Sequence, residues 1–198
     1  MRIIAFGCSY TYGQGLADCH VEPDHPGPKH SNYAWPSLLA SNLNCQIVNV
    51  SQPGYSNCAI LYEILKFDFQ QDDIICVLWT YKNRDARFEN SLNPIKLGHW
   101  NKKWFESQNS LDLLIKNKLH IHHAYCFLKS NQMKFYFMDV DVFVDLHKLV
   151  PLWYKKIDFI PIDIINLAKQ LPLGLDNLHP GPYFHSKVAD TFLQSIAG

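Results

Sequence analysis

The sequence predicts an α/β protein, built as a three-layer α/β/α sandwich around a mostly parallel central sheet. Short apolar runs alternate with longer segments of helical character along the chain, which is the order that parallel sheets require. The run "DIICVLWT" at 73–80 is apolar almost throughout, as expected for a strand buried on both faces. With 198 residues and 47% apolar content, the chain is long enough to bury the core of one such domain.

Each expected element follows from its local pattern. The apolar runs predict strands at 2–6, 46–50, 73–80 and 134–140. The segments between them predict helices near 32–43, 56–70, 110–129 and 162–171, with a last helix after "HPGP". Two stretches, 17–31 and 82–109, are polar or proline-bearing and lack periodicity, so we expect loop excursions there. The sequence contains no internal repeat, and we expect a single domain over 1–198.

Charge and composition argue against several classes of protein. Eighteen Lys and Arg residues balance eighteen Asp and Glu residues, so we do not expect the broad basic surface of a nucleic-acid-binding protein. No apolar run approaches the roughly 20 residues that cross a bilayer, and the apolar start is too short for a signal peptide. These features favour a cytoplasmic protein without a membrane span. They leave the oligomeric state open.

The histidines and cysteines predict no metal site. The six cysteines include no C-x-x-C pair, so neither a zinc ribbon nor a disulfide framework is expected. His20, His25 and His30 lie close together in the sequence, but their spacing matches no known metal site and Pro-Gly-Pro interrupts it. We therefore expect this stretch to be a solvated loop, and we expect no metal and no cofactor.

The predicted topology places a binding site at one edge of the sheet. In open parallel sheets, ligands bind beyond the carboxyl ends of the strands. Ser9 lies just past the first strand, 51–57 past the second and 80–84 past the third. All three segments therefore meet at the same edge.

The stretch "FGCSYTYGQG" around Ser9 fits none of the common glycine-rich loops. A phosphate-binding P-loop needs a lysine after its last glycine, and none follows Gly13. A dinucleotide fingerprint needs a third glycine where this chain has Asp18. The α/β-hydrolase elbow needs a glycine where this chain has Thr11.

Near the other end of the chain, "DNLHP" places Asp176 three residues before His179, ahead of the last predicted helix. Pro180 disfavours helical backbone at His179, so this histidine is expected in an extended loop, where its ring can point into a cleft. Asp176 can then fix the tautomer of the ring, which is the role of the carboxylate in a serine triad.

Together these two motifs resemble the first and last blocks of the SGNH (GDSL-type) hydrolases. The first block matches at Phe6, Gly7, Ser9, Thr11 and Gly13, whereas Cys8 stands where the family has aspartate. The resemblance implies the flavodoxin-like fold of that family, with Ser9 as the nucleophile, His179 as the base and Asp176 as the orienting acid. It covers the chain ends and the first 60 residues, and the middle of the chain diverges.

The resemblance also suggests groups that would stabilise an oxyanion. In "NVSQPGYSN", Gly54 matches the family's backbone donor, although a plain Pro-Gly turn between strand and helix explains it equally well. The family's G-x-N-D block is missing after the third strand. Asn83 is the nearest asparagine there and a candidate second donor, and Arg84 is a candidate for binding an anionic or carbonyl group of the substrate.

The activity that the resemblance implies is hydrolysis of a carboxylic ester through an acyl-enzyme on Ser9. Two alternatives stay open, an acyltransferase that uses the same acyl-enzyme and a binding or structural protein that keeps the fold without catalysis. The substrate would be a small-molecule or carbohydrate ester. Aromatic residues that could stack on sugar rings, or simply pack, favour an O-acylated, for example O-acetylated, carbohydrate; they are Trp79, Tyr81, Trp100 and Trp104.

Overall fold

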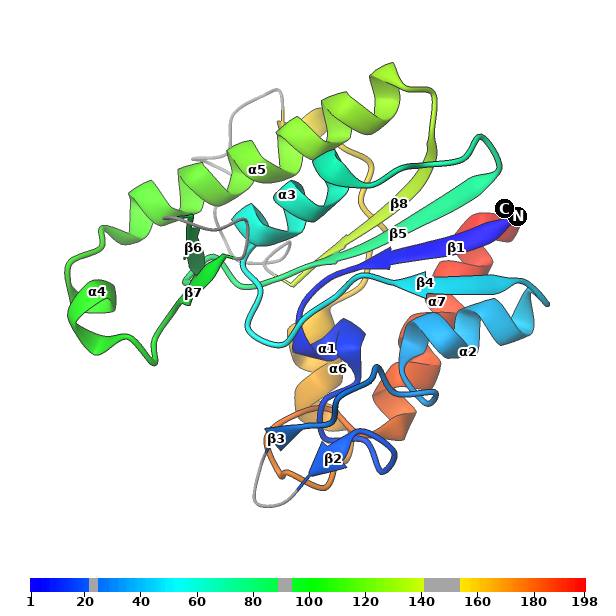
Figure 1. Cartoon of the computed structure of the whole chain (residues 1–198), viewed down its shortest axis with the longest axis horizontal. Helices are drawn as coiled ribbons and strands as arrows, with labels where there is room; N and C mark the ends of the chain where they lie inside the picture. The colour runs from blue at the N-terminus through cyan, green and yellow to red at the C-terminus, as the bar shows by residue number, and fades with distance from the viewer. Residues whose placement is uncertain (22–24, 89–93, 141–153) are drawn as a thin grey trace.

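A four-stranded parallel sheet forms the centre of the molecule (Figure 1). The structure is a computed structural model, and it describes residues 1–21, 25–88, 94–140 and 154–198. In spatial order the strands are β4 (Gln46–Asn49), β1 (Arg2–Phe6), β5 (Asp73–Trp79) and β8 (Lys134–Asp139). Every neighbouring pair in this sheet is parallel. A short bridge between Phe137 and Phe159 continues the parallel pairing beyond β8.

Helices cover both faces of the sheet, as the sequence predicts (Figure 1). Successive side chains of a strand point to opposite faces. Ile4 and Phe6 of β1 therefore join one buried cluster, and Ile3 and Ala5 join the other. The first cluster includes residues of α3 (Asn57–Lys66) and α5 (Ser110–Ser130). The second includes residues of α2 (Trp35–Asn42), α6 (Ile164–Gln170) and α7 (Pro182–Ala197).

The chain order of the strands creates a switch point beside β1. The connection through α2 leads from β1 to β4 on one side, whereas the connection through α3 returns across β1 to β5 on its other side. Connections of opposite direction leave a crevice at the carboxyl ends of the strands, which is where ligands bind in such sheets. The short helix α1 (Ser9–Tyr12) begins at this point.

Several elements differ from the sequence-based expectation. The helix predicted over 56–70 ends at Lys66, because Phe67 is extended and its ring packs edge-on against Phe6, with ring centroids 5.8 Å apart. Within the stretches expected as loop excursions, the structure contains short strands and one short helix. These elements are β2 (His20–Val21), β3 (His25–Pro26), β6 (Asp85–Arg87), β7 (Ile95–Leu97) and α4 (Lys102–Glu106).

A buried ion pair attaches α5 to the end of β8. The Lys118 ammonium donates to Asp139 Oδ2 over 2.6 Å and to the Tyr154 hydroxyl over 2.9 Å. The same hydroxyl donates to Asp139 Oδ2 over 2.9 Å. The side chains of Lys118 and Asp139 are only 7% and 1% exposed. Each charge has therefore lost its contact with water and is stabilised mainly by the opposite charge.

None of the helices in the described ranges combines the length and the apolar character that a bilayer-crossing segment needs.

Candidate active site

Ser9 is the first residue of α1, immediately beyond the end of β1. The turn into this helix needs a glycine at position 7, since a Cβ there would collide with the Thr11 side chain. Gly13 ends the helix in the left-handed conformation, with φ 85°, and its N–H donates to the Ser9 carbonyl over 3.0 Å. The spacing of Gly7, Thr11 and Gly13 thus has a geometric cause, and it leaves Ser9 buried at the switch point with 2% of its surface exposed.

Asp176 and His179 form a hydrogen-bonded pair, with 2.6 Å between Asp176 Oδ2 and His179 Nδ1. The other carboxylate oxygen accepts the backbone N–H groups of His179 and Leu178, over 3.0 and 3.1 Å. Burial alone would raise the pKa of Asp176, but these hydrogen bonds outweigh burial and hold the pKa below its ordinary value. An ionised carboxylate can only accept, so Nδ1 carries a proton, and in the neutral imidazole the lone pair is then on Nε2.

Two close contacts join the Asp176 loop to the segment that follows Ser9. Gly15, with φ 86°, lies against the Asp176 carboxylate, and its carbonyl accepts the Leu175 N–H over 2.7 Å. Tyr10 follows Ser9 directly, and its ring packs edge-on against the His179 ring, with centroids 6.1 Å apart. The structure therefore brings together the two motifs that lie at opposite ends of the chain, while Ser9 Oγ itself lies 4.0 Å from Cys8 Sγ and makes no hydrogen bond to His179 among the described residues.

Gly54 lies in the turn after β4, where Tyr55 N–H donates to the Gln52 carbonyl over 3.2 Å. Its φ of 78° is the left-handed value that a Pro-Gly turn places on its glycine. Lys96 of β7 lies over this turn and donates to the Pro53 carbonyl over 2.6 Å. The backbone of Gly54 thus has the tight turn that the sequence allows, and a lysine covers its Cα.

The loop after β5 is attached to α3 and to the Ser9 turn. The Asn57 amide accepts the Thr80 N–H over 2.8 Å and donates to the Thr80 carbonyl over 3.0 Å. The Thr80 hydroxyl donates to Cys8 Sγ over 3.2 Å and accepts from Arg84 Nη1 over 3.1 Å. Asn83 lies in the turn between Thr80 and Arg84 and is half-buried.

The histidine-bearing stretch borders this edge of the sheet, and one of its contacts is made by His30. His30 Nε2 lies 3.0 Å from the Ser51 carbonyl, and its ring packs against the Tyr12 ring with centroids 4.5 Å apart. Burial lowers the pKa of His30. In the described part of the chain, no three His, Cys, Asp or Glu side chains are grouped as metal ligands would be.

The four aromatic residues considered for sugar stacking have different surroundings. Trp79 is fully buried in the core, with its ring 5.3 Å from Phe137, so a ligand does not reach it. The Tyr81 hydroxyl lies 3.0 Å from that of Tyr10. Trp100 is 44% exposed, whereas Trp104 in α4 is half-buried. Tyr81 and Trp100 both contact Arg84, with its guanidinium carbon 5.3 and 5.6 Å from their ring centroids, so these two lie beside the loop after β5.

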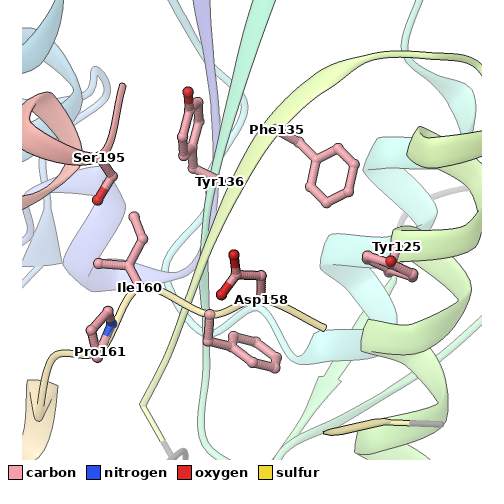
Figure 2. Close-up of a pocket in the computed structure, with 8 residues that line it drawn as sticks. Tyr125, Phe135, Tyr136, Asp158, Ile160, Pro161 and Ser195 are labelled. Carbon is pink, nitrogen blue, oxygen red and sulfur yellow. The ribbon is translucent and has the colours of Figure 1, made fainter. Parts of the chain in front are cut away.

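A pocket of about 330 Å³ lies elsewhere, along the outer side of β8 (Figure 2). The strand contributes Phe135 and Tyr136, and Asp158 comes from the segment beside it (Figure 2). Tyr125 of α5 and Ser195 of α7 line its two ends. None of the residues predicted for the site lines this pocket, so we assign it no part in the candidate active site.

Three residues of the site had no signal that sequence reasoning could use. Gly15 matches no motif in the sequence, but in the structure its lack of a side chain makes room for the Asp176 carboxylate. Tyr10 and Lys96 reach the site through contacts with residues distant in sequence, namely His179 and Pro53. Only a spatial arrangement reveals such contacts.

No protein-family model and no curated protein sequence matches this chain. Solved structures do match. A carbohydrate esterase aligns over 99% of this chain and 64% of its own length, at 13% identity and a TM-score of 0.58. An acetyl xylan esterase from the rumen bacterium Butyrivibrio proteoclasticus aligns over 98% and 63%, at 14% identity and a TM-score of 0.61.

A lipolytic protein of the G-D-S-L family from Desulfitobacterium hafniense aligns over 98% of both chains, at 11% identity and a TM-score of 0.54. The chain thus spans a little under two-thirds of the two esterases but nearly the whole of the lipolytic protein. At such identities, the likeness shows the fold. This chain is a divergent protein with the three-layer α/β/α fold of the SGNH (GDSL-type) hydrolases.

Proposed function

We propose that this chain is a serine hydrolase that cleaves a carboxylic ester through an acyl-enzyme on Ser9. The observation that carries the proposal is the 2.6 Å hydrogen bond between Asp176 and His179, in a loop that packs on the residue next to Ser9. A carboxylate, an imidazole and a hydroxyl are the three groups that a serine triad needs. Similarity in fold to esterases and a lipolytic protein agrees with this chemistry.

The proposed mechanism uses the lone pair on His179 Nε2. This nitrogen takes the Ser9 proton as Ser9 Oγ attacks the ester carbonyl carbon, and Asp176 stays ionised to stabilise the imidazolium. Collapse of the tetrahedral intermediate expels the alcohol, which receives the proton from His179. Water then attacks the acyl-enzyme as the same nitrogen takes one of its protons, and collapse of this second intermediate releases the carboxylic acid while His179 returns the proton to Ser9 Oγ.

The oxyanion of the intermediate would accept hydrogen bonds from the backbone N–H groups of Ser9 and Gly54. Gly54 has no Cβ, which favours close approach of a ligand to this turn, and the Lys96 side chain that covers its Cα would move aside as the ligand binds. Asn83, in the turn after β5, would supply a further donor. Loss of one such donor typically lowers turnover by about a hundred- to a thousandfold.

An O-acylated, for example O-acetylated, carbohydrate is the substrate that the named neighbours suggest. One of them is an acetyl xylan esterase, and Tyr81 and Trp100 offer aromatic surface beside the site. Another neighbour is a carbohydrate esterase whose active site displays divergent catalytic and non-catalytic binding functions. Because of that neighbour, non-catalytic binding is the alternative function to test for this chain. Acyl transfer to a sugar hydroxyl is a second alternative, which would use the same acyl-enzyme.

Labelling with a fluorophosphonate probe tests the nucleophile directly. We expect the wild-type protein to gain one covalent adduct on the peptide that carries Ser9, and Ser9→Ala to gain none. Ser130→Ala is the matched control, because Ser130 is an exposed serine at the end of α5. Failure of the wild type to react, under conditions that label a known serine esterase, would leave non-catalytic binding as the function. Analysis of the products with and without an added sugar hydroxyl then separates hydrolysis from acyl transfer.

A further inference from the structure

We propose that the ester bound at this site carries an anionic group, and that this group is bound by Arg84, whose guanidinium contacts the rings of Tyr81 and Trp100. The inference rests on the proposed function, because it names the substrate class of the same site. It differs from a neutral O-acetyl sugar in one respect, a negative charge that must lie within reach of the guanidinium.

Arg84 is a cation that has no negatively charged partner among the described residues. Its guanidinium carbon lies 5.3 Å from the Tyr81 ring centroid and 5.6 Å from that of Trp100, so two aromatic rings hold it. Nη1 donates to Thr80, while Nε is buried with no acceptor among the described residues. No carboxylate lies in ion-pair distance of Arg84 in the same part of the chain. A bound anion would satisfy donors that the protein leaves open.

A contrast within the chain shows what a structural arginine looks like here. Arg2 donates from Nε and Nη2 to the two carboxylate oxygens of Asp73, over 2.8 and 2.7 Å. The two parallel N–H donors of the Arg2 guanidinium are therefore both satisfied by a protein carboxylate. Arg84 keeps the corresponding Nε without an acceptor, although the residue is half-buried.

Arg84 is connected to the candidate catalytic residues by two short routes. The Thr80 hydroxyl, which accepts from Arg84, donates to Cys8 Sγ, and Cys8 directly precedes Ser9. The Tyr81 hydroxyl lies 3.0 Å from the Tyr10 hydroxyl, and the Tyr10 ring packs on His179. Arg84 thus lies at the same edge of the sheet as the proposed nucleophile.

A second cation lies on the same edge. The Lys96 ammonium donates to the Pro53 carbonyl beside Gly54 and lies 5.5 Å from the centroid of the Tyr55 ring. Among the described residues no carboxylate pairs with Lys96, and partial burial lowers its pKa. The Trp100 indole N–H donates to the Lys96 carbonyl over 3.4 Å, so Trp100 contacts both Lys96 and Arg84. Two cations without counterions attract a negatively charged ligand.

The negative charge can belong to either half of the ester, and matched substrate pairs separate the two sources. Mono-4-nitrophenyl glutarate against 4-nitrophenyl pentanoate tests an anionic acyl group. 4-Acetoxybenzoate against 4-acetoxybenzamide tests an anionic alcohol part. For each pair, the ratio of kcat/KM values for the anionic and the neutral ester is measured in wild type, Arg84→Gln, Arg84→Lys and Lys134→Gln.

We expect wild type to favour the anionic member of at least one pair, and Arg84→Gln to lower that ratio by about ten- to a hundredfold. Arg84→Lys keeps the charge without the planar fork and should restore part of the ratio, which excludes simple misfolding. Lys134→Gln is the control, because Lys134 also lies over a tyrosine ring, at 5.8 Å from Tyr136, but at the start of β8. The inference is wrong if wild type shows no anionic preference in either pair, or if Arg84→Gln leaves the preference unchanged.

Binding separates this inference from the proposed function. Benzoate and glutarate should raise the melting temperature of Ser9→Ala protein, and the shift should disappear when Arg84→Gln is added, with equal chloride as the control. If no ester is cleaved and Ser9 takes no label, the hydrolase proposal fails, and an Arg84-dependent shift still supports an anion site. If neutral esters are cleaved but no anion shows Arg84-dependent binding or preference, the hydrolase proposal stands and the anion site is refuted.

Discussion

A methyl group placed on Gly15 would lie 2.6 Å from Oδ1 of Asp176, which is closer than a Cβ contact can be. The φ of Gly15 is 86°, a value that costs a residue with a Cβ about 1–3 kcal/mol. We therefore expect Gly15→Ala to lower the free energy of unfolding and to displace Asp176 from His179. Urea unfolding measures the first effect, and the rate of fluorophosphonate labelling at Ser9 measures the second.

Gly13→Ala provides the comparison for this variant. Gly13 has nearly the same φ, 85°, but its Cβ would meet the side chains of Ser31 and Ala34. Both variants should lose stability through backbone strain. A Gly15→Ala protein that labels at the wild-type rate would show that Asp176 tolerates the methyl group, and that the close approach has no role in the site.

Replacing Asp176 by asparagine should lower kcat of ester hydrolysis by about a thousand- to ten-thousandfold. The amide presents an N–H that can donate to His179 Nδ1, so the ring would then carry its proton on Nε2 and lose the lone pair that the mechanism requires. The protein should still fold, because the backbone N–H groups of Leu178 and His179 keep an oxygen to donate to. Circular dichroism checks the fold, and an unchanged kcat would rule out the orienting role.

The low pKa of Asp176 predicts how this carboxylate contributes to stability across pH. A group whose pKa is lower in the folded than in the unfolded state stabilises the fold above its unfolded value, about 3.9 for aspartate. The contribution is lost as pH falls through the folded-state pKa. The difference in free energy of unfolding between wild type and Asp176→Asn should therefore be complete above about pH 5, which is about one pH unit above the unfolded value, and should shrink as the pH falls below about 4. A difference that stays constant over this range would contradict the assignment.

The sheet was predictable because its signals are local. Asp73–Trp79 is apolar at nearly every position, and the structure buries all of β5. The helix end at Lys66 was not predictable, because it depends on the contact of Phe67 with Phe6 across the fold. The strands β2 and β6 have two and three residues, which is too short for a periodic pattern to appear in the sequence.

For the candidate site, the sequence predicted which residues to inspect but not what surrounds them. Motif spacing drew attention to Ser9, Asp176 and His179, and their catalytic roles remain proposals. Nothing in the sequence indicated that the Tyr81 and Trp100 rings would both contact Arg84, because that arrangement depends on how the stretch after β5 folds back. Sequence patterns carry information about residues that are close along the chain, whereas these contacts join segments that only the tertiary structure brings together.

The hydrogen bonds between Asn57 and Thr80 predict a large cost for removing the amide. Asn57→Ala would leave the Thr80 N–H and carbonyl buried without their partners, since both residues are no more than 1% exposed. Each unsatisfied buried group costs about 1–3 kcal/mol. Because two groups lose their partners, the free energy of unfolding should fall by about twice that amount. Urea unfolding measures it, with Asn166→Ala in α6 as the control because Asn166 is exposed.

The buried pair of Lys118 and Asp139 predicts a non-additive result. Lys118→Met leaves the Asp139 carboxylate buried without its cation, which should cost about 3–5 kcal/mol of unfolding free energy. Adding Asp139→Leu removes the stranded charge, so the double variant should be more stable than Lys118→Met alone. Lys102→Met is the control, because its ion pair with Glu106 is exposed to solvent and contributes little. Simple addition of the two single effects would mean that the pair is not coupled, and that Tyr154 alone satisfies Asp139.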